Sequence, residues 1–224
     1  MLKHGGASLS LFSLFTKLRI MGSLGDIELL VASTNPGKVK EIRSSLNNWV
    51  DLKDLNAIAG SIELPETSGS IHGNAAQKAM ACWQITGINC LADDSGLEVN
   101  ALDGRPGVDS AFFAGHPRND DRNMVYLLDQ MEGVVDRSAS FVTVMALVID
   151  GELFLFEGRI NGTITNRCQG TGGFGYDPVF VPEGENRTFA EMSIEEKNKI
   201  SHRAKALAQV KSFLEKMHPG GAAD

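Results

Sequence analysis

The sequence predicts a mixed α/β fold, a central sheet with flanking helices, and three observations lead to this class. A short apolar run at 27–33, typical of a buried strand, passes directly into a helical pattern. Two longer apolar runs, 139–150 and 152–165, flank Asp150-Gly151, a dipeptide typical of a β-hairpin turn. The 224 residues contain no internal repeat, linker or low-complexity tract before the C-terminal tail, so one domain is expected.

The helix after the first strand has clear signals at its start. Asn35 is a good capping residue, and Pro36 suits the first helical position. Val39, Ile42 and Leu46 recur at helical spacing, so they would form the buried face of this helix.

Further elements follow in order along the chain. We expect a second helix over 70–86, a strand over 88–99 that is interrupted by an acidic loop, and a turn at 102–107. A third helix is predicted over 119–132, before the hairpin.

Helical sequence closes the domain, from Ser193 to Met217. In one continuous helix, Lys197 and His202 would lie about 140° apart around the axis and could not easily serve one small site. Ser201 is a good N-cap residue, so a break there would start a new helix and turn His202 and Arg203 inward. The alternative is a basic helical face that is exposed to water.

The two ends of the chain are expected to lie outside the fold. We predict that residues 1–25 form a disordered extension, although their apolar stretch at 8–15 resembles the core of a signal peptide. Basic residues follow that stretch and no small-residue cleavage site does, which argues against secretion. The predicted domain covers 26–217, and 218–224 would be a flexible tail.

Composition restricts the class of ligand. The formal net charge of -7 argues against a general nucleic-acid or anionic-membrane binder. An acidic protein that binds a phosphorylated small molecule needs a local cluster of cations or a metal ion. No apolar run approaches the length of a membrane span, and three sparse cysteines favour reduced thiols in the cytoplasm over a disulfide framework.

The junction between the first strand and the first helix is the first candidate site. Its sequence, "STNPGK" at 33–38, would direct the N–H groups of a helix start and the Lys38 ammonium toward an anion. The pattern is not a P-loop. A plain helix cap with a solvated lysine explains the same residues equally well.

Carboxylates form the second candidate site. Asp93 and Asp94 end an apolar strand, and neighbouring strand side chains point to opposite faces, so only one can easily enter a given site. Carboxylates near a phosphate binder suggest Mg²⁺, which takes oxygen ligands and keeps several waters. An acidic turn is the simpler interpretation, and Glu66, in a loop before a helix, indicates little by itself.

The third candidate site is "GTGGFGYDPVF" at 170–180, which contains four glycines and three aromatic residues. Such a segment is too rich in glycine for a good helix or central strand. A rigid aromatic patch on a permissive backbone suggests that it holds a flat ligand.

Six motifs in order, "STNPGK", "ETSGSIHGNAAQKA", "ADDSGLEV", "GRPGVDSA", "GTGGFGYDPVF" and "EEKNKISHRAKAL", resemble those of the non-standard purine nucleoside triphosphate pyrophosphatases. This is the inosine/xanthosine triphosphatase (dITP/XTP diphosphatase) family, and the resemblance spans about residues 27–215. It implies a long central sheet, two lobes around an active-site cleft and a homodimer. It also implies Mg²⁺-dependent cleavage of the α–β phosphoanhydride of ITP, dITP and XTP, which gives a monophosphate and pyrophosphate.

The resemblance also implies which residues bind and react. It assigns substrate binding to Ser33, Thr34, Asn35, Pro36, Gly37, Lys38, Ser95, Phe174, Gly175, Tyr176, Asp177, Lys197, His202 and Arg203. The two lysines would hold the triphosphate, Phe174 would stack on the purine, and His202 and Arg203 would contact the base. An arginine carries only donors, so Arg203 would favour a 6-keto purine over adenine.

The same resemblance assigns Glu66 and Asp94 to the metal and Asp94 to the role of general base, with Asp93 as the alternative for either role. Two positions depart from the family pattern. Gly73 stands where bacterial relatives usually carry glutamate, and Thr34 stands where glycine is usual.

Two competing interpretations remain open. The related septum-inhibitor-like nucleotide pyrophosphatases share the fold, but their first motif carries a serine-proline and paired arginines where this chain has "TNPGK". A nucleotide sensor that has lost catalysis would be expected to lack a metal carboxylate or a phosphate lysine. Both kinds of residue are present here.

Overall fold

The computed structural model describes residues 27–60 and 62–217, so the predicted N-terminal extension and C-terminal tail lie outside the described residues. The described chain forms a seven-stranded mixed sheet. Its strands are β1 (Glu28–Val31), β2 (Asp51–Asp54), β3 (Cys90–Val99), β4 (Pro106–Gly107), β5 (Ser138–Ile149), β6 (Glu152–Ile164) and β7 (Phe180–Pro182). The order is β2-β1-β3-β5-β6-β7, with β4 beside β3. β1 runs parallel to β2 and β3, and the other pairs are antiparallel.

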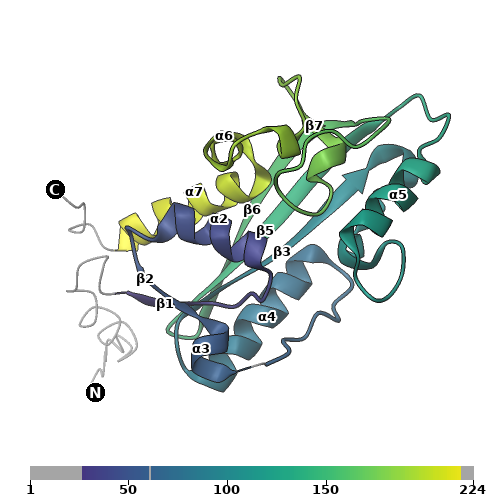
Figure 1. Cartoon of the computed structure of the whole chain (residues 1–224). Helices are drawn as coiled ribbons and strands as arrows, with labels where there is room; N and C mark the ends of the chain where they lie inside the picture. The colour runs from purple at the N-terminus through teal and green to yellow at the C-terminus, as the bar shows by residue number, and fades with distance from the viewer. Residues whose placement is uncertain (1–26, 61, 218–224) are drawn as a thin grey trace, which may run out of the picture.

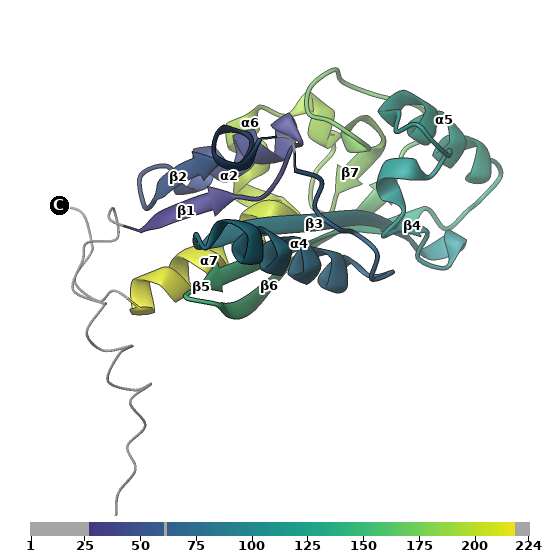
Figure 2. The same ribbon diagram turned by 90° about the horizontal axis from the view of Figure 1, so that it is seen from below.

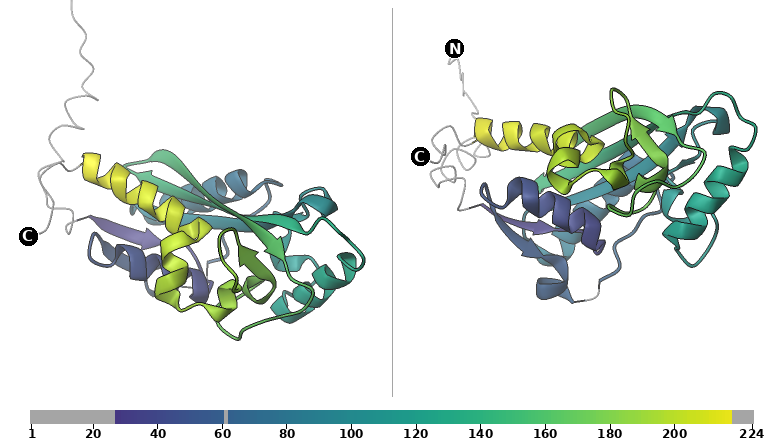
Figure 3. Two further views of the ribbon diagram at one scale, coloured as in Figure 1. Left: turned by 90° about the horizontal axis from the view of Figure 1, so that it is seen from above. Right: turned by 45° about the horizontal axis from the view of Figure 1, so that its top comes forward.

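Helices cover both faces of this sheet (Figures 1 and 2). They are α2 (Pro36–Leu46), α3 (Leu55–Ala59), α4 (Ile71–Thr86), α5 (Asp120–Gln130), α6 (Ile194–Ile200) and α7 (His202–Met217), with short 3₁₀ turns between them. α4 packs on one face, whereas α2 and α7 pack together on the other, and Figure 3 shows α7 lying across that face.

Alternation along the strands explains why both faces are apolar. In β1, Leu29 and Val31 pack in the cluster that contains α2 and α7, while Leu30 packs in the cluster beneath α4. A strand that is buried on both sides reads as a continuous apolar run, as the sequence predicted for this segment.

Local signals predicted the helix starts and the hairpin correctly. Asn35 caps α2, whose buried residues include Ile42 and Leu46, and Ser201 adopts an extended conformation between α6 and α7. The turn between β5 and β6 has positive φ at Asp150 and Gly151, 50° and 84°, as the Asp-Gly signal requires.

The predicted acidic loop inside the third strand was wrong. β3 is continuous and pairs with β5 from Cys90, opposite Val148, to Val99, opposite Ala139. Asp93 and Asp94 therefore lie in the middle of a central strand rather than at its end. The ladder satisfies their backbone groups, and cations from the two layers of helices lie beside their carboxylates.

No helix within 27–60 and 62–217 is long and apolar enough to cross a bilayer. The chain's three cysteines are all free, two of them buried.

Candidate active site

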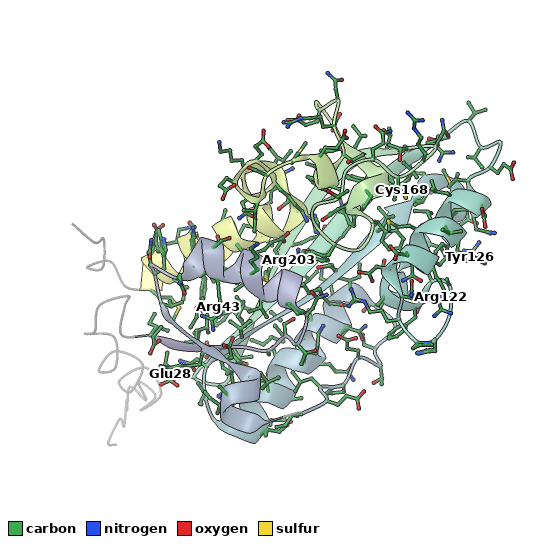
Figure 4. All side chains as sticks on the ribbon, in the orientation of Figure 1. Glu28, Arg43, Arg122, Tyr126, Cys168 and Arg203 are labelled. Atoms are coloured by element: carbon green, nitrogen blue, oxygen red, sulfur yellow. The ribbon has the colours of Figure 1, made fainter. Side chains whose placement is uncertain are left out.

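A cleft of about 1010 Å³ opens beside β3, where the sheet, the start of α2, the 62–69 loop and the 174–177 loop meet. Every residue assigned by resemblance to substrate or metal lines this cleft, except Pro36 and Gly37. The assigned residues that line it are Ser33, Thr34, Asn35, Lys38, Glu66, Asp94, Ser95, Phe174, Gly175, Tyr176, Asp177, Lys197, His202 and Arg203. Figure 4 labels Arg203 at the centre of the molecule, beside α2.

The junction at 33–38 forms a capped helix start. Asn35 Oδ1 accepts hydrogen bonds from the N–H groups of Gly37 and Lys38, at 2.9 and 3.3 Å. The capping interpretation therefore describes this junction, but its lysine is not solvated, because Lys38 Nζ lies 3.2 Å from Asp93 Oδ2. Gly37 has a packing role here: a Cβ at this position would lie 2.5 Å from the ring of Phe174.

Asp93 and Asp94 project to opposite sides of β3, as the strand geometry predicts. Asp93 faces Lys38 and Arg203 and is almost completely buried. Burial alone would raise the pKa of Asp93, but Lys38, Arg203 and Lys78 together hold it well below its usual range. Asp93 is therefore an ionised partner of buried cations.

Asp94 lies in a different environment. Its Oδ1 is 3.6 Å from Lys78 Nζ, and its buried Oδ2 has no hydrogen-bond partner in the described chain. Burial raises the pKa of Asp94 above its ordinary value, although Lys78 and Lys38 oppose this shift. An unpaired carboxylate oxygen beside a cleft is available to a water, a proton or a cation.

Lys78 joins the two carboxylates that were assigned to the metal. Its Nζ lies 2.5 Å from Glu66 Oε1 as well as near Asp94, and its side chain is buried on α4. Burial opposes the charged form, but Asp94, Asp93 and Glu66 raise the pKa of Lys78 above its ordinary value. The sequence reasoning missed this lysine; the available signal was its position beside Ala75 and Ala79 on a buried helical face.

Hydrogen bonds from three directions order the 174–177 loop. Asp177 Oδ2 accepts from the Phe174 N–H at 2.9 Å and from Lys197 Nζ at 2.6 Å. Asp120 Oδ2 accepts from the Gly175 N–H at 3.1 Å, and the Tyr176 hydroxyl donates to a backbone carbonyl at 2.9 Å. Asp177 is thus a structural member of the loop and also lines the cleft.

The break at Ser201 turns two side chains inward, as predicted. Ser201 Oγ accepts from the Ala204 N–H, and α7 begins at His202 with both His202 and Arg203 buried. His202 stacks on Phe141 with ring centroids 4.7 Å apart, and its Nδ1 has no hydrogen-bond partner in the described chain. Burial, Arg203 and Lys197 lower the pKa of His202 well below its ordinary value, so the imidazole is neutral at pH 7.

Arg203 is bonded through all three guanidinium nitrogens. Its Nε and Nη2 donate to Asp93, Nη2 also donates to Ser95 at 2.9 Å, and Nη1 donates to Glu41. An arginine has five N–H donors. These four hydrogen bonds leave one N–H, on Nη1, for any further acceptor.

Ion pairs around the cleft form two networks. The Glu41 network balances three cations with three carboxylates: Lys38, Asp93, Arg203, Glu41, Lys197 and Asp177. The Lys78 network sets one cation against two carboxylates, Glu66 and Asp94. The excess negative charge therefore lies at the two residues assigned to the metal.

The donor set of the Lys78 network fits Mg²⁺ in one specific way. Over 27–60 and 62–217, no group of three or more His, Cys, Asp or Glu side chains is gathered as a metal cage. Mg²⁺ usually keeps several waters and binds through one or two carboxylates together with substrate phosphates. Two carboxylates, one with an unpaired oxygen, match this mode of binding.

The two departures from the family pattern lie at or near the cleft. Thr34 is one of its lining residues. At Gly73, a Cβ would lie 2.2 Å from Ser68 Oγ, which bonds Asn74 Oδ1 at 3.0 Å. A side chain at this position would therefore displace the loop that follows Glu66.

Comparison with known proteins shows which family this chain belongs to. The model of the Ham1 family matches residues 29–213, and the chain therefore belongs to that family. A dITP/XTP pyrophosphatase from Porphyromonas gingivalis W83 is 49% identical over 84% of this chain and 97% of its own length. A dITP/XTP pyrophosphatase from Flavobacterium johnsoniae is 45% identical over 84% of this chain and 98% of its own length.

Solved structures confirm the fold class. The Staphylococcus aureus Ham1 protein superposes with a TM-score of 0.77 at 35% identity, covering 84% of this chain and 98% of its own. The nucleoside-triphosphatase, or dITP/XTP pyrophosphatase, of Mycobacterium abscessus has a TM-score of 0.68 at 44% identity, covering 82% and 98%. The predicted resemblance and the predicted α/β architecture are both confirmed.

Proposed function

We propose that this protein hydrolyses the non-standard purine nucleoside triphosphates ITP, dITP and XTP to nucleoside monophosphate and pyrophosphate. Membership of the Ham1 family and relatives named dITP/XTP pyrophosphatase at 49% and 45% identity support the proposal. Such an enzyme removes damaged purines from the nucleotide pool.

One observation carries the proposal: segments far apart in the sequence bring complementary chemistry to one cleft. Asp94 and Glu66 both approach Lys78 at the lining of this cleft, and Phe174 and His202 also line it. Lysines that can attract a triphosphate, Lys38 and Lys197, line the same cleft. A nucleotide needs all three kinds of contact at once.

Asp94 is the general base of the proposed reaction. A water oxygen attacks the α-phosphorus, its proton passes to Asp94, and the bond to the bridging oxygen breaks so that pyrophosphate leaves. The unpaired Oδ2 of Asp94 supports this role, whereas both charge and position commit Asp93 to Lys38 and Arg203. We therefore favour Asp94 over Asp93.

Glu66 and Asp94 are the proposed ligands of Mg²⁺. When bound, the ion would offset negative charge on the phosphate oxygens. The excess of carboxylates in the Lys78 network supports a divalent cation, because a triphosphate would otherwise meet negative charge there.

Base recognition is proposed to rest on Phe174, His202 and Arg203. Phe174 is half-buried and lies against two cations, with Lys197 Nζ 4.7 Å and Arg203 Cζ 5.6 Å from its ring centroid. The remaining N–H of Arg203 and the neutral His202 could pair with the 6-keto edge of hypoxanthine or xanthine. Leaving a buried donor unpaired beside adenine would cost about 1–3 kcal/mol.

We further propose that the protein acts in the cytoplasm as a homodimer and binds neither nucleic acid nor membranes. Free cysteines support the cytoplasmic location, and the acidic net charge argues against binding to nucleic acid or anionic membranes. The family resemblance supports the homodimer. Light scattering coupled to gel filtration would test the dimer directly.

Product analysis tests the proposed function. The purified protein is incubated with Mg²⁺ and equal concentrations of ITP, XTP, dITP, GTP, ATP and TTP. Monophosphate and pyrophosphate from the inosine and xanthosine nucleotides, with little from ATP and GTP, are expected. Cleavage mainly of the pyrimidine nucleotide, or ITP binding without products, would contradict the proposal.

A further inference from the structure

Glu41 is a buried carboxylate that does not line the cleft, yet it contacts two cations that do. It lies on α2 and is only 4% exposed. Its Oε1 lies 2.8 Å from Lys197 Nζ, and its Oε2 accepts from Arg203 Nη1 at 2.5 Å. Burial alone would raise the pKa of Glu41, but Arg203 and Lys197 hold it below its ordinary value.

The two cations come from opposite sides of the helix break at Ser201. Lys197 belongs to α6 and Arg203 to α7, and they are 4% and 1% exposed. Glu41 therefore ties α2 to both helices through a single carboxylate. Its neighbour on the same helix, Lys38, reaches the cleft from the first turn.

We propose that Glu41 is a positioning residue, with one cation on each of its carboxylate oxygens. It fixes the position of Lys197, which binds phosphate, relative to that of Arg203, which contacts the base. This inference rests on the proposed function, which gives the two cations their separate roles. Glu41 itself touches neither phosphate nor base.

Each cation has a second partner that limits how far it can move alone. Lys197 also pairs with Asp177 at 2.6 Å, and Arg203 also pairs with Asp93 at 3.2 Å. These partners belong to separate segments, the 174–177 loop and β3. In the described chain, Glu41 is the carboxylate that pairs with both cations.

A glutamine at this position cannot reproduce the arrangement. Its amide has one acceptor oxygen, and its NH₂ group is a donor, as are lysine and arginine. One cation would keep its hydrogen bond while the other would face a donor. Loss of the buried negative charge would also leave the repulsion between the Lys197 and Arg203 cations without the carboxylate that offsets it.

The test compares Glu41→Gln with two variants that each loosen one cation, Lys197→Met and Arg203→Lys. Two readouts are measured for each: the inhibition constant of pyrophosphate and the ratio of kcat/KM for ITP to that for ATP. Lys197→Met should weaken pyrophosphate binding, and Arg203→Lys should reduce base discrimination. Glu41→Gln should change both, each on the order of tenfold.

The matched control is Glu98→Gln, which removes a carboxylate from a partly exposed ion pair with Arg159 on the sheet. It should leave both readouts unchanged. Glu41→Asp keeps the charge and should recover part of both effects. If Glu41→Gln does not fold in thermal melts, Glu41→Asp carries the test: its shorter side chain should shift both readouts from the wild-type values, and a folded Glu41→Asp variant with both readouts unchanged would overturn the positioning role.

The outcomes distinguish a failure of the proposed function from a failure of the positioning role of Glu41. Wild-type protein that does not hydrolyse ITP would remove the proposed function. Wild-type protein that hydrolyses ITP, together with a folded Glu41→Gln variant that retains both readouts or loses only one, would overturn the positioning role and leave the proposed function intact.

Discussion

Asp93 and Asp94 are neighbours in β3, but their carboxylates lie on opposite faces of the sheet and meet different cations. Asp93 pairs with Lys38 and Arg203, whereas Asp94 pairs with Lys78, at 3.6 Å, and its Oδ2 has no hydrogen-bond partner among the described residues. Two identical side chains one residue apart are therefore expected to have different roles, one structural and one chemical.

Replacement of Asp94 by asparagine should abolish turnover and preserve the fold. The amide cannot accept the proton of an attacking water, yet it has nearly the same shape. We expect ITP hydrolysis to fall by at least about a hundredfold, while calorimetry still detects nucleotide binding. Unchanged turnover would contradict the assigned base.

Replacement of Asp93 by asparagine should act mainly on stability. It would leave Lys38 without its buried counter-charge and Arg203 with Glu41 alone, and breaking a buried pair in this way typically costs about 3–5 kcal/mol. Urea unfolding of both aspartate variants measures the difference. If Asp94→Asn proves the more destabilising of the two, the division of roles is wrong.

The fold was predictable where local chemistry decides it. The Asn35 cap, the Asp150-Gly151 turn and the Ser201 break all depend on residues next to each other in sequence. β2 was missed because it is a short edge strand of mostly polar sequence, with only Leu52 buried.

The site was predictable only in part, and for a physical reason. Resemblance supplied many of the residues that line the cleft, but it did not supply Lys78, which also lines it, or Glu41. Charged helix residues usually lie exposed to solvent, whereas these two are buried. Their burial depends on partners brought by distant segments, such as Arg203 for Glu41 and Asp94 for Lys78. The acidic loop was predicted wrongly for the same reason, since the paired cations stabilise Asp93 within β3.

Stability should fall at mildly acidic pH because of His202. Its folded pKa lies below the unfolded value of about 6.5, so the unfolded state binds the proton more readily. The titration of His202 therefore leaves the free energy of unfolding unchanged above about pH 6.5. As the pH falls from there toward the folded pKa, the free energy of unfolding decreases by up to about 1.4 kcal/mol per pH unit. The positive neighbours Arg203, Lys197 and Lys38 disfavour protonation of the folded state, and Asp93 opposes them.

Urea unfolding at pH 5.5 and pH 7.5 measures this loss for the wild type and for His202→Gln. The difference between the two pH values should shrink in the variant, because glutamine does not titrate. An equal pH dependence in both proteins would show that His202 does not contribute.

Gly158 should be intolerant of any side chain. It lies in β6 beneath the start of α7, where a Cβ would sit 2.0 Å from the carbonyl oxygen of His202 and 2.6 Å from the Ala206 nitrogen. Gly158→Ala should therefore push α7 away from the sheet, lowering the free energy of unfolding by about 1–3 kcal/mol. Thr163→Ala, at an exposed position of the same strand, is the control. A variant as stable as the wild type, with normal ITP turnover, would contradict this packing.

The most direct test of the reaction is hydrolysis of ITP in water enriched in ¹⁸O, followed by mass spectrometry of both products. Attack of water on the α-phosphorus, activated by Asp94, predicts one ¹⁸O in the inosine monophosphate and none in the pyrophosphate. Label in the pyrophosphate would place the attack on the β-phosphorus and contradict the proposed chemistry of this cleft.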